Sequence, residues 1–143
     1  MAMRVKISSA LIDRIVAVAA ASPEAEVCGL LFGSVDRIDA VEPCINVAPD
    51  PARRFEIDPA ALLAAHRRAR DGAMMPVGCY HSHPGGIAAP SPRDAADAAP
   101  DGGIWLIVAG GRVTAWRAVA DGPVHGRFAA LSIDPSCGDP SSG

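Results

Sequence analysis

Two histidines stand two residues apart in the segment HSHP, and a serine and an aspartate follow after a short stretch rich in glycine and proline. The histidines are His81 and His83, and the later pair is Ser91 and Asp94. Side chains two apart on a strand point to the same face, so the two imidazoles emerge together, about 7 Å apart along the backbone. Two imidazoles so placed can converge on one metal ion. Taken alone, however, this spacing is more often a pair of surface histidines at a strand end.

The second half of the pattern also reads as the start of a helix. Ser91 can be the N-cap, Pro92 the first helical residue and Asp94 the acidic residue at the third position, which explains them without any chemistry. Capping does not explain why they follow the histidines so closely. The turn at Pro84-Gly85-Gly86 can fold the helix start back against the histidines. Two imidazole nitrogens and one carboxylate oxygen would then form a three-ligand set with an open fourth position, as in catalytic zinc sites.

A hydrolytic zinc site also needs a proton acceptor, and Glu26 is the candidate. It stands just before the apolar run Cys28 to Ser34, where a carboxylate at the entrance of a buried strand can reach the centre of a sheet. By residue type alone, Glu24 and Glu26 are ordinary exposed acids that follow a helix.

The complete pattern resembles the JAMM (MPN+) metalloprotease family. Its signature of a distant Glu, then His-Ser/Thr-His-Pro, then a spaced Ser and Asp is met by Glu26, His81 to Pro84, Ser91 and Asp94, with no departure. The segment RFEIDP, Arg54 to Pro59, resembles the stretch before the motif in stand-alone bacterial members.

The resemblance implies a role for each motif residue. His81, His83 and Asp94 would bind Zn²⁺. Glu26 would accept a proton from the metal-bound water and later deliver it to the leaving amine. Ser91 would stabilise the tetrahedral oxyanion by hydrogen bonding, which contributes specifically in the transition state.

The same resemblance implies a zinc-dependent isopeptidase or peptidase that hydrolyses an amide bond after the C-terminal Gly-Gly of a ubiquitin-like or sulfur-carrier protein. One alternative is a non-catalytic MPN-type protein-binding module with a structural metal. A second is a zinc deaminase, but deaminases need a His-x-Glu and a Pro-Cys-x-x-Cys element, and the sequence contains neither.

Composition limits the other classes. The chain of 143 residues is half hydrophobic and carries a net charge of −3, which gives no reason to expect nucleic-acid binding. No apolar run approaches the roughly 20 residues that span a bilayer, so we expect a cytoplasmic protein that binds no membrane. The four cysteines, Cys28, Cys44, Cys79 and Cys137, show no C-x-x-C spacing, and Cys28 and Cys79 are predicted to be buried free thiols. The sequence leaves the oligomeric state open.

Hydrophobic periodicity, caps and turn residues predict strands interspersed with helices. Strands are expected at residues 3–7, 28–34, 37–47 with a break at Pro43, 75–80, 104–109, 112–119 and 124–133, and helices at 10–21, from Asp58-Pro59 to about 71, and 93–99.

These elements predict one α/β domain in which a mixed sheet is flanked by helices. By resemblance, this would be the layered MPN fold with a curved sheet, an architecture like that of cytidine deaminase. The domain would cover residues 1–133, and residues 134–143 would form a flexible C-terminal tail.

Overall fold

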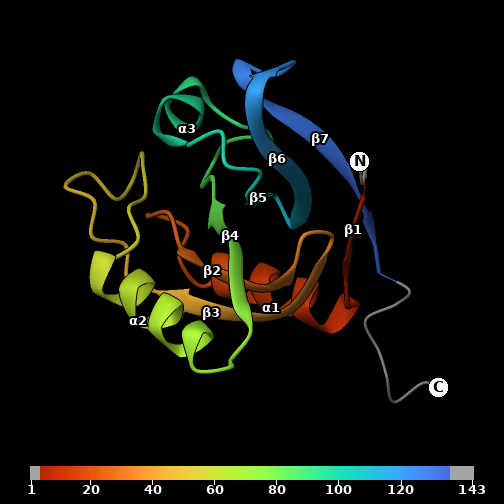
Figure 1. The fold of residues 1–143 in the computed structure, drawn as a ribbon. Helices are drawn as coiled ribbons and strands as arrows, with labels where there is room; N and C mark the ends of the chain where they lie inside the picture. Colours follow the sequence, from red (N-terminus) through yellow and green to blue (C-terminus); the bar gives the residue numbers. More distant parts are fainter. Residues whose placement is uncertain (1–3, 136–143) are drawn as a thin grey trace.

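A computed structural model describes residues 4–135 as seven strands and three helices (Figure 1). The strands are β1 (Arg4–Ile7), β2 (Cys28–Ser34), β3 (Arg37–Cys44), β4 (Met75–Ser82), β5 (Ile104–Ala109), β6 (Arg112–Gly122) and β7 (Gly126–Asp134), and the helices are α1 (Ser9–Ala20), α2 (Pro59–Arg70) and α3 (Pro92–Asp97). None of these helices is long and apolar enough to cross a membrane. Most of the predicted tail, including Cys137, lies outside the described residues.

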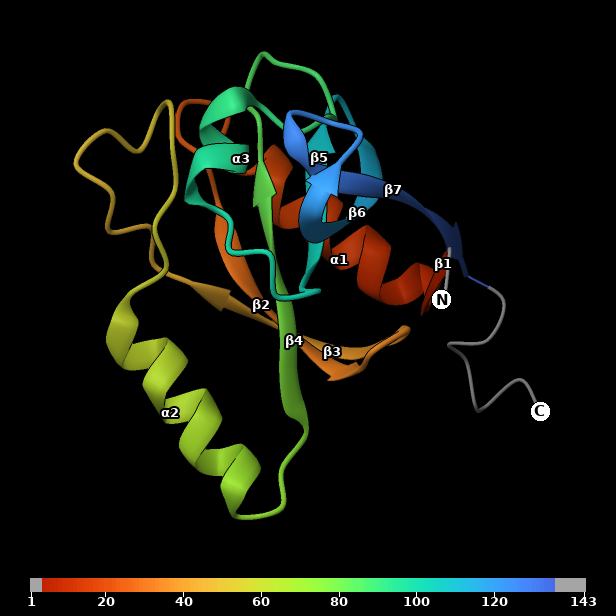
Figure 2. The same cartoon turned by 45° about the horizontal axis from the view of Figure 1, so that its top comes forward.

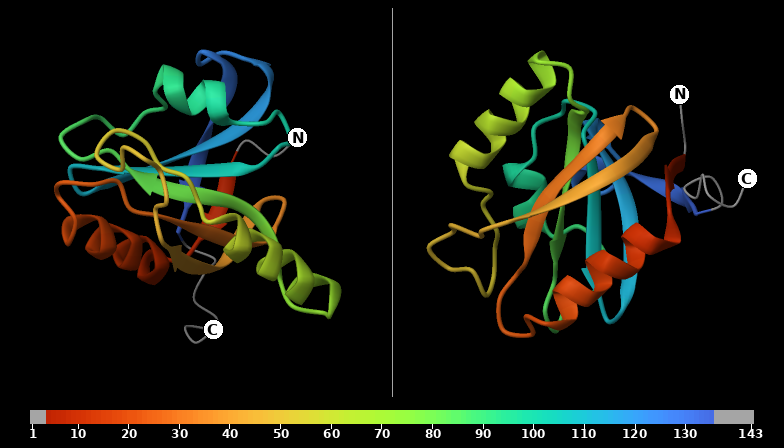
Figure 3. Two further views of the ribbon diagram at one scale, coloured as in Figure 1. Left: turned by 90° about the vertical axis from the view of Figure 1, so that its left-hand side faces the viewer. Right: turned by 90° about the horizontal axis from the view of Figure 1, so that it is seen from below.

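The strands form one closed barrel in the order β1-β3-β2-β4-β5-β6-β7. β1 runs parallel to both β3 and β7 and so closes the barrel. β4 and β5 also pair in parallel, whereas the remaining neighbours are antiparallel. The predicted mixed sheet flanked by helices is confirmed. Figure 3 (left) shows α1 and α3 on opposite sides of β4 and β5.

Strand β2 is buried on both faces, as its continuous apolar run predicts. Leu31 packs in the main core together with Ile15 of α1. Its neighbours Leu30 and Phe32 point the other way and pack against Ala65 of α2. Alternate residues of one strand therefore hold two helices on opposite faces of the sheet.

Several predicted bounds match the structure. β2 and β5 begin and end where the sequence predicts, and α2 begins after an N-cap at Asp58, whose side chain accepts a hydrogen bond from the Ala60 N–H at 3.0 Å. β4 runs two residues further than predicted, because His81 and Ser82 continue the parallel ladder with β5. The first histidine of the motif is therefore part of the sheet itself.

The predicted break at Pro43 is wrong. β3 continues through Pro43, which pairs with Gly29 of β2. Proline has no N–H to donate and is tolerated where a strand has a neighbour on one side only. The pairing of β1 with β3 involves Arg37 and Ile38, so Pro43 lies beyond that second ladder and interrupts nothing.

Candidate metal centre

The structure brings the motif residues together at one end of β4. His81 is its penultimate residue, His83 follows it, and Asp94 comes from α3. Cys28 of β2 is the register partner of His81, and this pairing places Glu26, two residues earlier in the chain, beside the histidines. Figure 2 shows the chain leaving the end of β4 and returning through α3 on the same side.

Three ligand atoms converge. The Nε2 atoms of His81 and His83 lie 2.9 Å apart, and Oδ2 of Asp94 lies 3.2 Å and 3.1 Å from them. Ligands held at about 2.0–2.1 Å from a tetrahedral zinc ion are about 3.3 Å apart. The spacing and the nitrogen and oxygen donors therefore fit such an ion.

The two imidazoles are oriented by different means. Nδ1 of His83 lies 2.9 Å from the carbonyl oxygen of Ile87, so an Nδ1–H donates there and leaves Nε2 free to act as a ligand. His81 is fully buried and its Nδ1 has no partner among the described residues. Its ring stacks on Phe55, with centroids 4.2 Å apart and planes inclined by 18°, and meets the edge of Trp105. At Nδ1, where His83 has a hydrogen bond, His81 is therefore held by aromatic packing.

The predicted helix cap is confirmed, and it coincides with the ligand set. The N–H of Asp94 donates to Oγ of Ser91 at 3.0 Å, and the N–H of Ser91 donates to Oδ2 of Asp94 at 3.0 Å. This reciprocal capping box fixes the carboxylate that faces the histidines. Capping and metal binding therefore use the same geometry and do not exclude each other.

The charges of the three ligand groups are coupled. Burial lowers the pKa of His81, more than its contact with Asp94 raises it. Burial alone would raise the pKa of Asp94, but the hydrogen bonds from His81 and His83 outweigh it and hold the pKa well below its usual range. For His83, burial is outweighed by the contacts with Asp94 and the Ile87 carbonyl, which raise its pKa. An ionised carboxylate and a neutral His81 are the forms that ligate a cation.

Glu26 is the fourth acidic or basic group at the centre. It is 7% exposed, and its Oε1 has no hydrogen-bond partner among the described residues. One carboxylate oxygen lies within 4.8 Å of ligand atoms of His81 and His83, so by proximity alone Glu26 could be a ligand. The Asp94 oxygen, in contrast, contacts both Nε2 atoms directly.

The pKa of Glu26 suits proton transfer. Burial is the main cause that raises it, from 4.5 to about 7, while the positive charge of His83 opposes this and the charge of Asp94 adds to it. A general base or acid works best when its pKa lies near the working pH.

Sequence reasoning missed the residues that support the site. Phe55 stacks on His81, and Asn46 bonds to the Glu26 carbonyl oxygen, and both contacts depend on the fold. Trp105, which meets the His81 ring, lies in an apolar cluster with Phe128. No short-range sequence signal marks Phe55 as the residue that stacks on His81.

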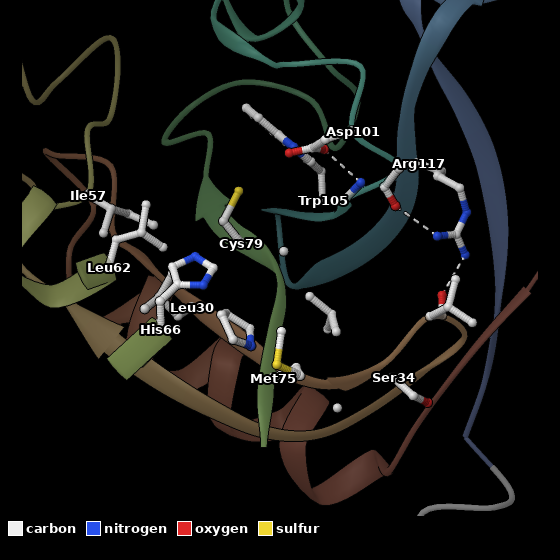
Figure 4. Close-up of a pocket in the computed structure, with 17 residues that line it drawn as sticks. Leu30, Ser34, Ile57, Leu62, His66, Met75, Cys79, Asp101, Trp105 and Arg117 are labelled. Atoms are coloured by element: carbon white, nitrogen blue, oxygen red, sulfur yellow. Dashed lines mark hydrogen bonds between the residues drawn. The ribbon is translucent and has the colours of Figure 1, made fainter. Parts of the chain in front are cut away.

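The two larger cavities of the described chain lie on different parts of the surface. A cavity of about 540 Å³ adjoins the centre, and its lining includes Glu26, His83 and Ser91. A larger one of about 700 Å³ lies between α2 and β4 and contains no motif residue; Leu30, Leu62, His66 and Met75 contribute to it (Figure 4). Of the two, only the smaller cavity is lined by residues of the motif.

The cysteines of the described residues take no part in the centre. Cys28, Cys44 and Cys79 are free thiols. Burial raises the pKa of Cys28 to about 12 and raises that of Cys79 further. A thiol that stays protonated is a poor metal ligand, so the centre differs from the cysteine-rich sites of zinc deaminases.

A barrel flanked by helices that presents two histidines, an aspartate and a nearby glutamate defines a JAMM-type (MPN) domain. The chain matches the family described as prokaryotic homologs of the JAB domain over residues 8–119, and it belongs to that family.

Similar proteins support this assignment. The chain is 40% identical to a desampylase of Haloferax volcanii over 121 residues, 80% of this chain and 81% of the relative. It is 41% identical over 68 residues to a probable TtuB-protein conjugate cleaving protease of Thermus thermophilus, 48% of this chain and 46% of that protein. A solved structure described as a JAMM metalloprotease-like zinc site in the proteasome and signalosome shares the fold, with a TM-score of 0.52 and 20% identity over 92% of this chain and 98% of the other. The chain is thus an enzyme, a hydrolase of the isopeptidase type.

The raised pKa of Glu26 predicts a pH-dependent effect on stability. Between pH 4.5 and about 7 the folded protein keeps a proton on Glu26 that the unfolded chain has released, so this group makes the fold less stable as the pH rises through that window. In metal-free protein, Glu26→Gln should therefore stabilise the fold above about pH 7 by roughly 1–3 kcal/mol, and should be neutral below about pH 4.5.

Urea unfolding of chelator-treated wild type and Glu26→Gln, at several pH values across that window, measures this difference. A stability difference that does not change with pH would show that the carboxyl group titrates alike in the folded and unfolded states.

Proposed function

We propose that this protein is a zinc-dependent isopeptidase or peptidase that hydrolyses an amide bond after the C-terminal Gly-Gly of a ubiquitin-like or sulfur-carrier protein. One observation carries the proposal: two imidazole nitrogens and a carboxylate oxygen lie 2.9–3.2 Å apart beside the buried carboxylate of Glu26. A cytoplasmic location is part of the proposal.

His81, His83 and Asp94 would hold the zinc ion. When bound there, zinc would lower the pKa of a coordinated water and polarise the scissile carbonyl group. The protein's own contribution is to keep three ligands preformed, with Asp94 fixed by its capping box and His83 by the Ile87 carbonyl.

Glu26 would act as the proton acceptor. Its pKa of about 7 allows it to take a proton from the attacking water and to return it to the leaving amine near neutral pH. The unpartnered Oε1 is available for this transfer, because no described side chain occupies it.

Ser91 would donate a hydrogen bond to the oxyanion. Its Oγ already accepts the N–H of Asp94, and a hydroxyl group still has one O–H to donate. Ser91 lines the same cavity as Glu26 and His83, where that donor can meet a developing negative charge.

The substrate class rests on the relatives and on the shape of the site. The two relatives are named for removing or cleaving protein conjugates. The cavity at the centre is lined in part by small residues, Ala52, Gly86 and Ala89. A tail without Cβ atoms can approach a site lined by such residues closely, which favours a C-terminal Gly-Gly. A binding module with a structural metal would not need a buried, unpartnered carboxylate beside the ligands.

The first prediction separates ligands from catalytic groups. His81→Ala and His83→Ala should each lose most of the zinc, because two protein ligands hold it weakly. Glu26→Gln and Ser91→Ala should keep the zinc and lose roughly 10²–10⁴-fold and about 10²–10³-fold in rate. Elemental analysis and single-turnover hydrolysis measure the two effects.

Full zinc occupancy in a His81→Ala, His83→Ala double variant would contradict the ligand assignment. Ser91→Ala should also cost about 1 kcal/mol of stability through the lost cap. If stability alone falls, Ser91 is a cap and not an oxyanion donor.

The second prediction concerns specificity. A ubiquitin-like fusion that ends in Gly-Gly before the cleaved bond should be hydrolysed at least about tenfold faster than one ending in Ala-Ala or Val-Gly, which corresponds to ~1.4 kcal/mol of transition-state binding. The reason is that side chains on the tail would clash with the walls of the cavity. Equal rates on all three tails would reject glycine recognition and indicate a general peptidase.

A further inference from the structure

The backbone at Glu26 is not held by regular pairing. Glu26 and Val27 precede β2, which begins at Cys28. The carboxylate oxygen Oε1 has no partner of its own, so no described hydrogen bond holds that oxygen in place. The position of the carboxylate therefore depends on the contacts of the backbone that carries it.

Ser82, the residue between the two histidines, holds Val27. The Val27 N–H donates to Oγ of Ser82 at 2.9 Å, and the Ser82 N–H donates to the Val27 carbonyl oxygen at 3.0 Å. Ser82 is 3% exposed, so water cannot readily replace its hydroxyl group. One residue thus ties the strand of the metal ligands to the segment of Glu26.

Asn46 holds Glu26 from the other side. Its Nδ2 donates to the carbonyl oxygens of Glu26 and Arg54 at 3.0 Å and 3.1 Å. Its Oδ1 accepts the N–H groups of Ala48 and Glu56 at 3.0 Å and 3.1 Å. The side-chain amide therefore uses both donors and both acceptor sites.

The loop organised by Asn46 supports two parts of the centre. The Glu26 N–H donates to the Pro51 carbonyl oxygen at 2.7 Å, so both polar backbone groups of Glu26 bond to this segment. The same loop carries Phe55, whose ring stacks on His81. Figure 2 shows the segment between β3 and α2 rising beside the start of β2 and α3.

We infer that Asn46 and Ser82 are positioning residues, which act by holding the Glu26–Val27 backbone so that the Glu26 carboxylate faces the metal ligands. The inference rests on the proposed function of Glu26. Small displacements of a reacting group are costly, since a misplacement of about 1 Å can lower a rate about 10²-fold. Neither residue needs to touch the substrate for this effect.

A double-mutant cycle tests this inference. Asn46→Ala and Ser82→Val should each lower kcat roughly ten- to a hundredfold and leave KM and zinc content unchanged. In a Glu26→Gln background the same changes should cost less than about twofold, because they act through a group that is already absent.

Conservative variants and a stability control sharpen the test. Ser82→Thr keeps the hydroxyl group that its isostere Ser82→Val lacks, and it should retain the wild-type rate; the cavity of about 230 Å³ beside Ser82 has room for a methyl group. Asp58→Ala is the stability control. It removes the N-cap of α2, which lowers the stability of the fold, and it should leave the rate unchanged.

Amide hydrogen exchange in the metal-free protein gives a readout independent of activity. The Val27 N–H should exchange faster in Ser82→Val than in Ser82→Thr or the wild type. Unchanged Val27 exchange in Ser82→Val would overturn the assigned role of Ser82.

The outcomes distinguish the inference from the proposed function. A wild type that leaves Gly-Gly conjugates uncut, or a Glu26→Gln variant as fast as the wild type, overturns the proposed function and the inference with it. An inactive Glu26→Gln beside fully active Asn46→Ala and Ser82→Val overturns the inference alone. The inference is also overturned if Asn46→Ala and Ser82→Val lower kcat by the same factor in the Glu26→Gln background as in the wild type.

Discussion

The structure depends on the burial of a carboxylate between two imidazoles. Asp94 is 5% exposed and His81 is fully buried, and an isolated charge in such a place would be strongly destabilising. The Asp94 carboxylate is tolerated because His81, His83 and the Ser91 N–H surround it. A cation bound between the three ligands would compensate the charge further. The buried negative charge of Asp94 therefore favours the binding of a cation at this site.

The sheet supplies the rigidity that this arrangement needs. β4 lies between β2 and β5 and pairs with both up to the histidines, so the position of His81 is set by two ladders. Its side chain, which lacks a hydrogen bond at Nδ1, is held by aromatic packing. By contrast, Asp94 and Glu26 come from a short helix and a segment of coil, which must be tied to β4 by individual hydrogen bonds. The polar contacts around Ser91, Ser82 and Asn46 provide those ties.

The features predicted well from the sequence are local. The strand Cys28–Ser34 is a continuous apolar run, the cap at Asp58 precedes a proline, and the three side chains that converge, His81, His83 and Asp94, fall within fourteen residues of one another. Each of these depends on neighbours in the chain, so a pattern of residue types is enough to predict it.

The features that could not be predicted join distant segments. The parallel pairing of β1 with β7 closes the barrel between the two ends of the described chain. Asn46 reaches the Glu26 carbonyl across twenty residues, and Phe55 contacts His81 from a separate segment, between β3 and α2. Whether Pro43 breaks β3 depends on how many strands lie beside it, and the residue pattern does not show that number. Contacts between segments that are distant in the chain are not encoded in short-range residue patterns.

In the proposed metal centre, His81, His83 and Asp94 hold the metal, and Glu26 stands beside it without binding it. X-ray absorption spectroscopy at the zinc edge, on the wild type and on Glu26→Gln, tests this most directly. We expect only nitrogen and oxygen neighbours of zinc at about 2.0–2.1 Å, two of them imidazoles, and the same spectrum for both proteins. A sulfur neighbour at about 2.3 Å, or a spectrum that changes in Glu26→Gln, would contradict it.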